Sequence, residues 1–221
     1  MLLIVLPAHV LAMEVVLSEP DQQRFSADEI EHIEELAGSI EAEVRRLLPA
    51  LPESIFLEVR TEVQAYTASG ATGAAVGSNR IAWVVDTQRS DEVVSIANAT
   101  LRGILFHELH HLARGCFQGY ESFIDGAVCE GMATVFARDF GSAEQSWATY
   151  PPDVADWFYE VRDLPASATT GEWMFFHSDG RVRIGYKVGT YLVDRAMQAT
   201  GKTSAQLTNV SSPEVVRLAG F

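Results

Sequence analysis

The sequence predicts an α+β fold, with a small β-sheet in the N-terminal part of the chain and mostly helices after it. Residues 55–60 and 80–86 are short apolar segments next to turn residues, which is typical of strands. Longer stretches repeat apolar residues every three or four positions, which is typical of helices. The strand patterns precede residue 90 and helical patterns dominate beyond it, so we expect a sheet followed by a helical half.

Length and composition predict one folded unit. The chain has 221 residues, 48% of them apolar and 21% charged, as in ordinary soluble globular enzymes. We expect a single domain over residues 1–221, made of an N-terminal α/β lobe (about 1–93), a central helix (about 95–114) and a helical C-terminal lobe (about 115–221). The net charge of −14 argues against a nucleic-acid partner, because phosphate binding needs clustered Lys and Arg.

The N-terminal residues 1–16 are apolar but lack the features of a secretory signal. No Lys or Arg precedes the hydrophobic run, and Pro7 and His9 interrupt it. We therefore expect a first strand at about residues 10–17. Nothing else approaches the length of a membrane span. The expected location is cytoplasmic, with secretion as the alternative. Cys116 and Cys129 are too few for a disulfide framework and are expected to be buried, reduced thiols.

The elements of the N-terminal lobe can be assigned in order. Ser26 followed by Glu29 forms a capping box that begins a long amphipathic helix, which ends before Pro49. Residues 55–60 alternate as a half-buried strand does. Gly77, Ser78 and Asn79 are turn residues that lead into the strand at residues 80–86. The last strands of this sheet are expected to lie at the edge of a cleft, where an edge strand can bind an extended peptide.

Helices account for most of the rest. Asp91 or Ser95 can cap a helix that runs to Arg114, and Gly115 can end it in a left-handed conformation. A second helix is expected over about residues 120–139, closed by Gly141. A third starts at Pro151 and Pro152 and reaches about residue 163. Residues 164–183 are expected to be irregular, and a last helix to cover about residues 185–199.

The central helix carries an HExxH motif, His107-Glu108-Leu109-His110-His111. Two histidines four residues apart project from one face of a helix, so two imidazole nitrogens can bind one metal ion. Glu108 then lies where it can take a proton from water activated by the metal. His110 is not needed by the motif and is expected to be a packed or surface histidine, with a second-shell role as the alternative.

A catalytic zinc site needs a third protein ligand. Glu130 is the best candidate, because it follows His111 after eighteen residues and stands in the segment Cys-Glu-Gly-Met-Ala. A second helix packed antiparallel to the first could bring its carboxylate to the same metal, and Gly131 would let the two helices approach closely. Cys129 is disfavoured as a ligand, because on a helix it points about 100° away from Glu130.

HExxH followed by eighteen residues and Glu resembles the gluzincin zinc peptidases, the clan of thermolysin-like enzymes and aminopeptidases. Residues 103–111, 129–133 and 184–193 also resemble a bacterial family of predicted Zn-dependent proteases, and the likeness spans roughly residues 25–200. The resemblance implies that His107, His111 and Glu130 bind zinc and that Glu108 is the general base. It also implies a thermolysin-like fold, with a substrate-binding edge strand before the helical half.

Two features of such enzymes need a separate assignment in this chain, namely the residue that orients a zinc histidine and the oxyanion donor. Many thermolysin-like members carry an Asp four residues after the ligand Glu, but here that position is Thr134, so Asp125 and Asp139 are the substitutes considered for orienting a histidine. The donor to the tetrahedral oxyanion is expected to be Tyr186, with His177 as second choice. Arg183 and Tyr191 are further alternatives.

These observations favour a zinc metallopeptidase that hydrolyses a peptide or protein substrate by direct attack of water. The alternative is a zinc-containing binding or regulatory module that does not turn over peptides. Glu108 argues against the module, because a pure binding site has no need of a base between its ligands. A zinc hydrolase for non-peptide substrates is a third hypothesis.

Overall fold

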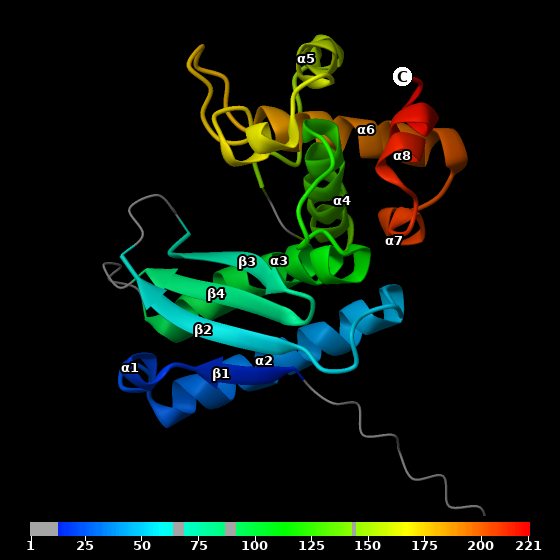
Figure 1. Cartoon of the computed structure of the whole chain (residues 1–221). Helices are drawn as coiled ribbons and strands as arrows, with labels where there is room; N and C mark the ends of the chain where they lie inside the picture. The colour runs from blue at the N-terminus through cyan, green and yellow to red at the C-terminus, as the bar shows by residue number, and fades with distance from the viewer. Residues whose placement is uncertain (1–12, 64–68, 87–91, 143–144) are drawn as a thin grey trace, which may run out of the picture.

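A computed structural model describes residues 13–63, 69–86, 92–142 and 145–221 (Figure 1). Its N-terminal half holds a four-stranded sheet in the order β1-β2-β4-β3, made of β1 (Glu14–Leu17), β2 (Phe56–Glu62), β4 (Arg80–Asp86) and β3 (Ala71–Gly77). The strands predicted in this region are confirmed for β2 and β4 and for the described part of β1. Residues 10–12 of the predicted first strand lie outside the described residues.

Strand β3 was not recognised in the sequence, because its residues are mostly Gly and Ala and lack the apolar alternation of a strand. It pairs antiparallel with β4, whereas β1, β2 and β4 are parallel to one another. The turn predicted at residues 77–79 therefore joins two paired strands. As the last strand in the order, β3 has one side without a partner strand in this sheet, as expected for a strand at the edge.

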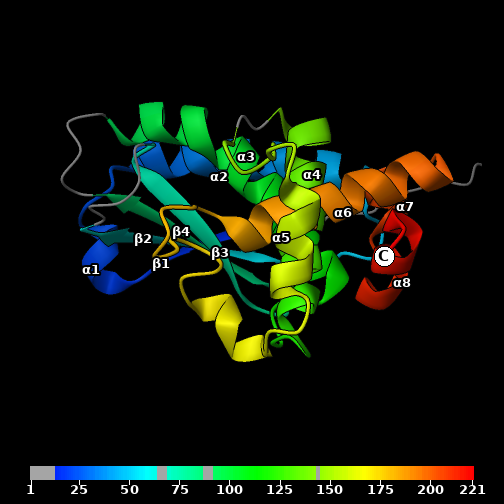
Figure 2. The same ribbon diagram turned by 90° about the horizontal axis from the view of Figure 1, so that it is seen from above.

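Two long helices cover one face of the sheet (Figure 2). Helix α2 (Ala27–Leu47) begins with the predicted capping box, in which Ser26 and Glu29 each bond the other's backbone N–H. Helix α3 (Val93–Arg114) ends at Gly115, whose φ of 82° is left-handed as predicted. Its N-cap is Glu92, so Ser95 lies inside the helix, while Asp91 is outside the described residues. A short helix, α1 (Glu19–Gln22), precedes α2.

The C-terminal half is helical and has a hydrophobic core of its own. Its elements are α4 (Phe123–Gly141), α5 (Val154–Val161), the 3-10 helix η1 (Ala166–Thr170), α6 (Ile184–Thr200), α7 (Ser204–Leu207) and α8 (Ser212–Ala219). The prediction that the helix near residues 185–199 is the last was wrong, because α7 and α8 follow it. Helix α4 begins after Ser122 rather than at residue 120, and the left-handed residue beyond it is Ser142, not Gly141.

Contacts between α3 and α4 run in opposite order along the two helices. Arg102 bonds the carbonyl of Phe140 at 3.2 Å, and the rings of Phe106 and Phe136 are 5.6 Å apart. Further along α3, His107 meets Glu130. The expected antiparallel arrangement is therefore confirmed. Among the described residues no helix is both long enough and apolar enough to cross a membrane.

Gly131 has a different neighbour from the one expected. It does not serve the approach of α4 to α3, because a Cβ built on Gly131 would lie 2.2 Å from the backbone of Gly189 on α6. In turn, a Cβ on Gly189 would lie 1.7 Å from the carbonyl oxygen of Ala127. The two glycines let the backbones of α4 and α6 touch, one residue beyond Glu130.

Replacing Gly189 by alanine should therefore destabilise the protein, even though alanine favours helices. The added methyl group meets backbone atoms that cannot move aside, and overpacking of this kind costs about 1–3 kcal/mol of unfolding free energy. Gly171→Ala is the matched control, since its Cβ would meet no atom closer than 3.7 Å. Urea denaturation of the two variants tests this, and equal stabilities would contradict the close contact.

Candidate metal centre

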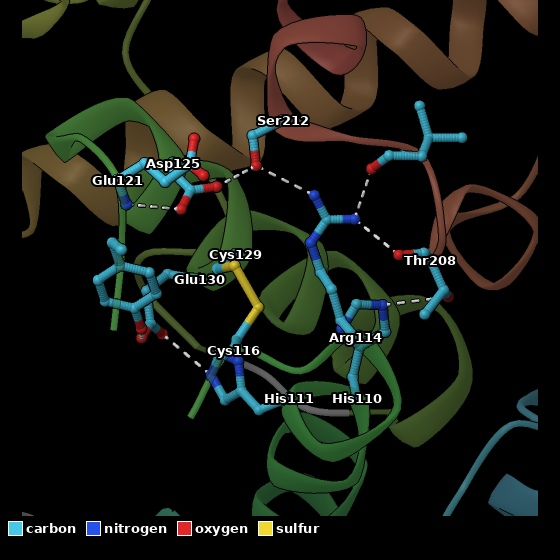
Figure 3. The surroundings of a disulfide bond; sticks show 12 residues. His110, His111, Arg114, Cys116, Glu121, Asp125, Cys129, Glu130, Thr208 and Ser212 are labelled. Carbon is cyan, nitrogen blue, oxygen red and sulfur yellow. Dashed lines mark hydrogen bonds and ion pairs between the residues drawn. A yellow bond between two sulfur atoms is a disulfide. The ribbon is translucent and has the colours of Figure 1, made fainter. Parts of the chain in front are cut away.

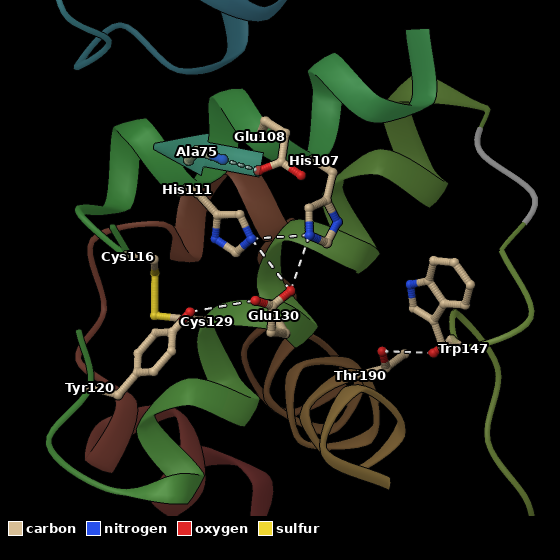
Figure 4. A network of polar contacts seen from close by, with 10 residues as sticks. All are labelled: Ala75, His107, Glu108, His111, Cys116, Tyr120, Cys129, Glu130, Trp147 and Thr190. Carbon is tan, nitrogen blue, oxygen red and sulfur yellow. Dashed lines mark hydrogen bonds and ion pairs between the residues drawn. A yellow bond between two sulfur atoms is a disulfide. The ribbon is translucent and has the colours of Figure 1, made fainter. Parts of the chain in front are cut away.

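Three side chains from α3 and α4 converge on one point (Figure 4). The Nε2 atoms of His107 and His111 are 3.0 Å apart, and Oε2 of Glu130 lies 3.2 Å from the first and 3.4 Å from the second. The histidines are one helical turn apart on α3, and the antiparallel α4 supplies the carboxylate. The structure thus brings together the three side chains that the sequence predicted as ligands, and their role as ligands stays a prediction.

The spacing of these three atoms fits a tetrahedral zinc ion. Ligand atoms about 2.0–2.1 Å from zinc at tetrahedral angles are about 3.3 Å from one another. The three observed separations of 3.0, 3.2 and 3.4 Å match that edge length. Three protein ligands leave the fourth position of such an ion free for water or substrate, which distinguishes a catalytic from a structural site.

The ligands are buried and electrostatically coupled. His107 and His111 are 8% and 5% exposed, and the Glu130 side chain is 13% exposed. Burial opposes ionisation of Glu130, but the imidazoles of His111 and His107 outweigh it and hold the pKa of this carboxyl well below its usual value. Burial likewise opposes protonation of His111, yet Glu130 raises its pKa. A cation shared by these groups removes the conflict, since it supplies positive charge without a proton.

The side chain of Glu108 extends from α3 toward the side of β3 that has no partner strand in the sheet. Its Oε2 accepts a hydrogen bond from the backbone N–H of Ala75 in β3 at 2.8 Å. That N–H is on the side of β3 away from β4, because Glu108 is its partner. Gly73 permits the contact, since a Cβ there would lie 2.2 Å from Ile104 and 3.3 Å from the Glu108 side chain. Glu108 therefore borders both the three ligands and the free strand edge.

The substitutes considered for orienting a zinc histidine are wrong. Asp125 accepts from the Ser212 hydroxyl at 2.5 Å and from the backbone N–H of Glu121, and Asp139 pairs with Arg138. Neither contacts His107 or His111. In the part of the chain that the structure describes, the Nδ1 atoms of both histidines are buried without a hydrogen-bond partner.

A second pair on the motif helix, His110 and Arg114, attaches the C-terminal segment (Figure 3). His110 is fully buried and its Nε2 lies 3.3 Å from the Thr208 hydroxyl, which confirms the expected packed histidine. Arg114 donates to the carbonyls of Thr208 and Val210 at 2.6 and 2.7 Å. Burial, with the nearby His111 and Arg114, lowers the pKa of His110 well below its usual value, so it stays neutral.

Cys116 and Cys129 form a disulfide, so the prediction of reduced thiols was wrong (Figures 3 and 4). The bond connects the loop after α3 to α4, with 6.1 Å between the two Cα atoms. At one end, the backbone N–H of Cys116 bonds the carbonyl of His111, and at the other, Cys129 precedes Glu130. The disulfide thus links α4, which carries Glu130, to the loop after α3, the helix that carries His107 and His111.

Removing the disulfide should lower the free energy of unfolding by about 2–4 kcal/mol, because closing a loop of this length restricts the unfolded chain. The Cys116→Ser/Cys129→Ser variant, or wild type kept reduced, should unfold at lower urea concentration than oxidised wild type. Reductant added to the double variant is the control and should change nothing. Identical unfolding of oxidised and reduced wild type would contradict the bond.

The two predicted oxyanion donors have different surroundings. Burial and the nearby Glu130 carboxylate raise the pKa of Tyr186 well above its usual value, so its hydroxyl keeps its proton beside the centre. His177 pairs instead with Asp179 at 2.9 Å and packs on Trp173, with ring centroids 4.1 Å apart. No described contact joins His177 to the three ligands. Its role in catalysis stays a prediction.

Two further residues were missed in the sequence, Tyr120 beside Glu130 and Trp147 beside Tyr186. The Tyr120 hydroxyl donates to Oε1 of Glu130 at 3.5 Å. Burial, together with the Glu130 carboxylate, raises the pKa of Tyr120. The ring of Trp147 packs against that of Tyr186, with centroids 5.9 Å apart, and its carbonyl accepts a hydrogen bond of 3.3 Å from the Thr190 hydroxyl (Figure 4). Both belong to segments between helices, which have no periodicity that could have marked them.

Comparison with protein families gives a match over most of the chain. A family model described as "Predicted Zn-dependent protease (DUF2268)" matches residues 26–217, which include all three candidate ligands and Glu108. No curated protein and no solved structure matches the chain.

Proposed function

The chain belongs to the family of predicted Zn-dependent proteases, and from this premise and the geometry of the centre we propose that it is a zinc-dependent peptidase. His107, His111 and Glu130 would hold the ion. Zinc in such a site acts as a Lewis acid, which acidifies water and polarises the carbonyl to be attacked. The thermolysin-like arrangement implied by the motif is part of this proposal.

The observation that carries the proposal is the position of Glu108. A carboxylate next to the three ligands can take a proton from water and return it to the leaving amine. Its bond to Ala75 places it at the open edge of β3, where an extended peptide can add as a further strand. A substrate aligned on that edge would pass over the base. This favours hydrolysis over the alternative of a non-catalytic zinc module.

Metal analysis tests the first step of the proposal. Protein purified without chelator should contain about one zinc per chain, and dialysis against a chelator should remove both zinc and peptide hydrolysis. Zinc added back should restore both. Freshly purified protein that neither contains nor takes up zinc would end the proposal, whatever its activity.

Tyr186 is the proposed donor to the oxyanion, because its protonated hydroxyl is next to Glu130. Losing one such donor typically lowers kcat about 10²- to 10³-fold, so Tyr186→Phe should fall in that range with unchanged zinc content. Tyr120→Phe is the comparison, since it removes the other tyrosine hydroxyl that contacts Glu130. A kcat that drops only in Tyr120→Phe would transfer the role to Tyr120.

The disulfide is evidence on the cellular compartment of the protein. Disulfides persist in oxidising compartments and are rare in the cytosol. The Cys116–Cys129 bond therefore favours the secreted alternative over the expected cytoplasmic location. Labelling of free thiols in protein taken directly from its native cells distinguishes the two, since an oxidising compartment leaves both cysteines unlabelled.

A further inference from the structure

The guanidinium of Arg183 lies among three aromatic rings at the start of α6. Its Cζ is 4.8 Å from the ring centroid of Trp147, 5.1 Å from that of Phe175 and 5.2 Å from that of Tyr186. Aromatic faces attract a guanidinium and hold its plane, while its N–H groups stay available in that plane. The rings therefore fix the position of the cation without occupying its hydrogen-bond donors.

Several arginines placed over aromatic rings also bind a carboxylate, but Arg183 and Arg195, which lies over Tyr191, do not among the described residues. Arg80 and Arg102 each bind a glutamate, and Arg181 binds both Asp179 and Glu160. For Arg183, no ion pair occurs with any of the described residues. Unlike Arg195, which lies over one ring, Arg183 lies among three rings.

The backbone of Arg183 is held in a conformation that favours glycine. Its φ and ψ are 58° and 39°, which is left-handed, and it forms the N-cap of α6 without a side-chain cap. Its N–H donates to the carbonyl of Phe175 at 2.9 Å, and the next-but-one residue, Gly185, bonds the carbonyl of Trp173. A strained residue fixed from both sides, with its side chain unpaired, suggests a requirement for that side chain in function.

Tyr186 connects Arg183 to the metal centre. One side of the Tyr186 ring receives the Arg183 guanidinium, and Glu130 is a neighbour of the same side chain. Trp147, which also contacts Arg183, packs against the same Tyr186 ring, with centroids 5.9 Å apart. The unpaired cation is thus one aromatic side chain away from a candidate zinc ligand.

We propose that Arg183 binds a carboxylate of the peptide substrate, which rests on the proposed peptidase function. A planar guanidinium pairs with a carboxylate through two parallel hydrogen bonds, and substrate would supply the partner that Arg183 lacks among the described residues. Phe175, Phe176 and Val182, which are 38%, 67% and 41% exposed, give apolar surface next to it for the substrate residue that carries the carboxylate. That carboxylate is either the C-terminus or an Asp or Glu side chain.

Peptide capture by an inactive protein tests the inference without needing turnover. Immobilised, zinc-loaded Glu108→Gln protein is offered a random peptide library with free C-termini and the same library with amidated C-termini. A second pair, both amidated, either contains or lacks Asp and Glu. In one of the two pairs, the amount of peptide captured from the library that carries the carboxylate should be about tenfold or more above the amount captured from the library that lacks it.

Arg183→Asn in the same background removes the cation but keeps a residue that tolerates the left-handed conformation. The capture ratio should then fall to about one. Lys202→Gln is the control for loss of one positive charge, because Lys202 lies beyond the opposite end of α6, about 25 Å along the helix. This control should keep the ratio.

The results separate the two sources and the two proposals. If Arg183→Asn abolishes the preference for free over amidated C-termini, the carboxylate bound by Arg183 is the C-terminus. If it abolishes the preference for the library that contains Asp and Glu, the carboxylate is a side chain. Equal capture within both pairs, no capture at all, or a ratio that survives Arg183→Asn would overturn the inference. If the wild-type protein hydrolyses no peptide but the Glu108→Gln protein still prefers carboxylate-bearing peptides, the role of Arg183 is supported and the peptidase function is not. If the wild type hydrolyses peptides but no such preference is found, the peptidase function is supported and the role of Arg183 is not.

Discussion

Glu108→Gln is expected to keep about one zinc per chain and to lower peptide hydrolysis about 10²- to 10⁴-fold, the usual contribution of a general base. Glutamine has nearly the same shape, so the fold and the three ligands should be unaffected, but its amide cannot accept the proton from water. Hydrolysis of a peptide library followed by mass spectrometry, with zinc content measured on the same samples, provides the comparison.

The matched control for this change is Glu31→Gln, on the exposed side of α2. It makes the same chemical substitution and should leave both zinc and hydrolysis at the wild-type level. If Glu108→Gln cleaved peptides as fast as wild type, the proton transfer assigned to this carboxylate would be excluded and another base would be needed.

Glu130→Gln is expected to weaken zinc binding by more than the roughly 10- to 100-fold that loss of a second-shell partner costs. The variant removes the negative charge that the two histidines and the ion share, and leaves an amide oxygen that is a poorer ligand. Competition with a chelator of known affinity measures the change. Glu121→Gln, at an exposed position shortly before α4, is the control.

Unchanged zinc affinity in Glu130→Gln would mean that the carboxylate is not a ligand, and the centre would have to be reassigned. Together the two glutamates distinguish the rival functions. In a peptidase, Glu108→Gln loses turnover but keeps zinc, whereas Glu130→Gln loses both turnover and zinc. A binding module would lose zinc at Glu130 but would show no turnover that depends on Glu108.

Parts of this molecule that depend on local geometry could be predicted from the sequence. His107 and His111 share a helix face because the helical period is 3.6 residues, and no other part of the chain is needed for that. The capping box at Ser26 and the left-handed Gly115 are local as well. The spacing to Glu130, read with the family resemblance, anticipated the third member of the cluster that the structure assembles.

Contacts between distant segments were not predictable in the same way. Strand β3 is made of small residues, and only pairing with β4 defines it as an edge strand. The two cysteines are ordinary apolar positions until α3 and α4 pack antiparallel and bring them together. Asp125 and Asp139 have suitable chemistry for orienting a histidine, but packing gave each of them other partners.

The sequence by itself determined the chemistry at one end of this centre, namely two histidines and a glutamate on one helix. Tertiary structure decided what surrounds them: the free edge of β3 at Glu108, the disulfide beside Glu130, and the aromatic rings around an unpaired Arg183. The physical reason is that helix periodicity is set by neighbouring residues, whereas the partner of a buried or charged side chain is set by which distant segment packs against it.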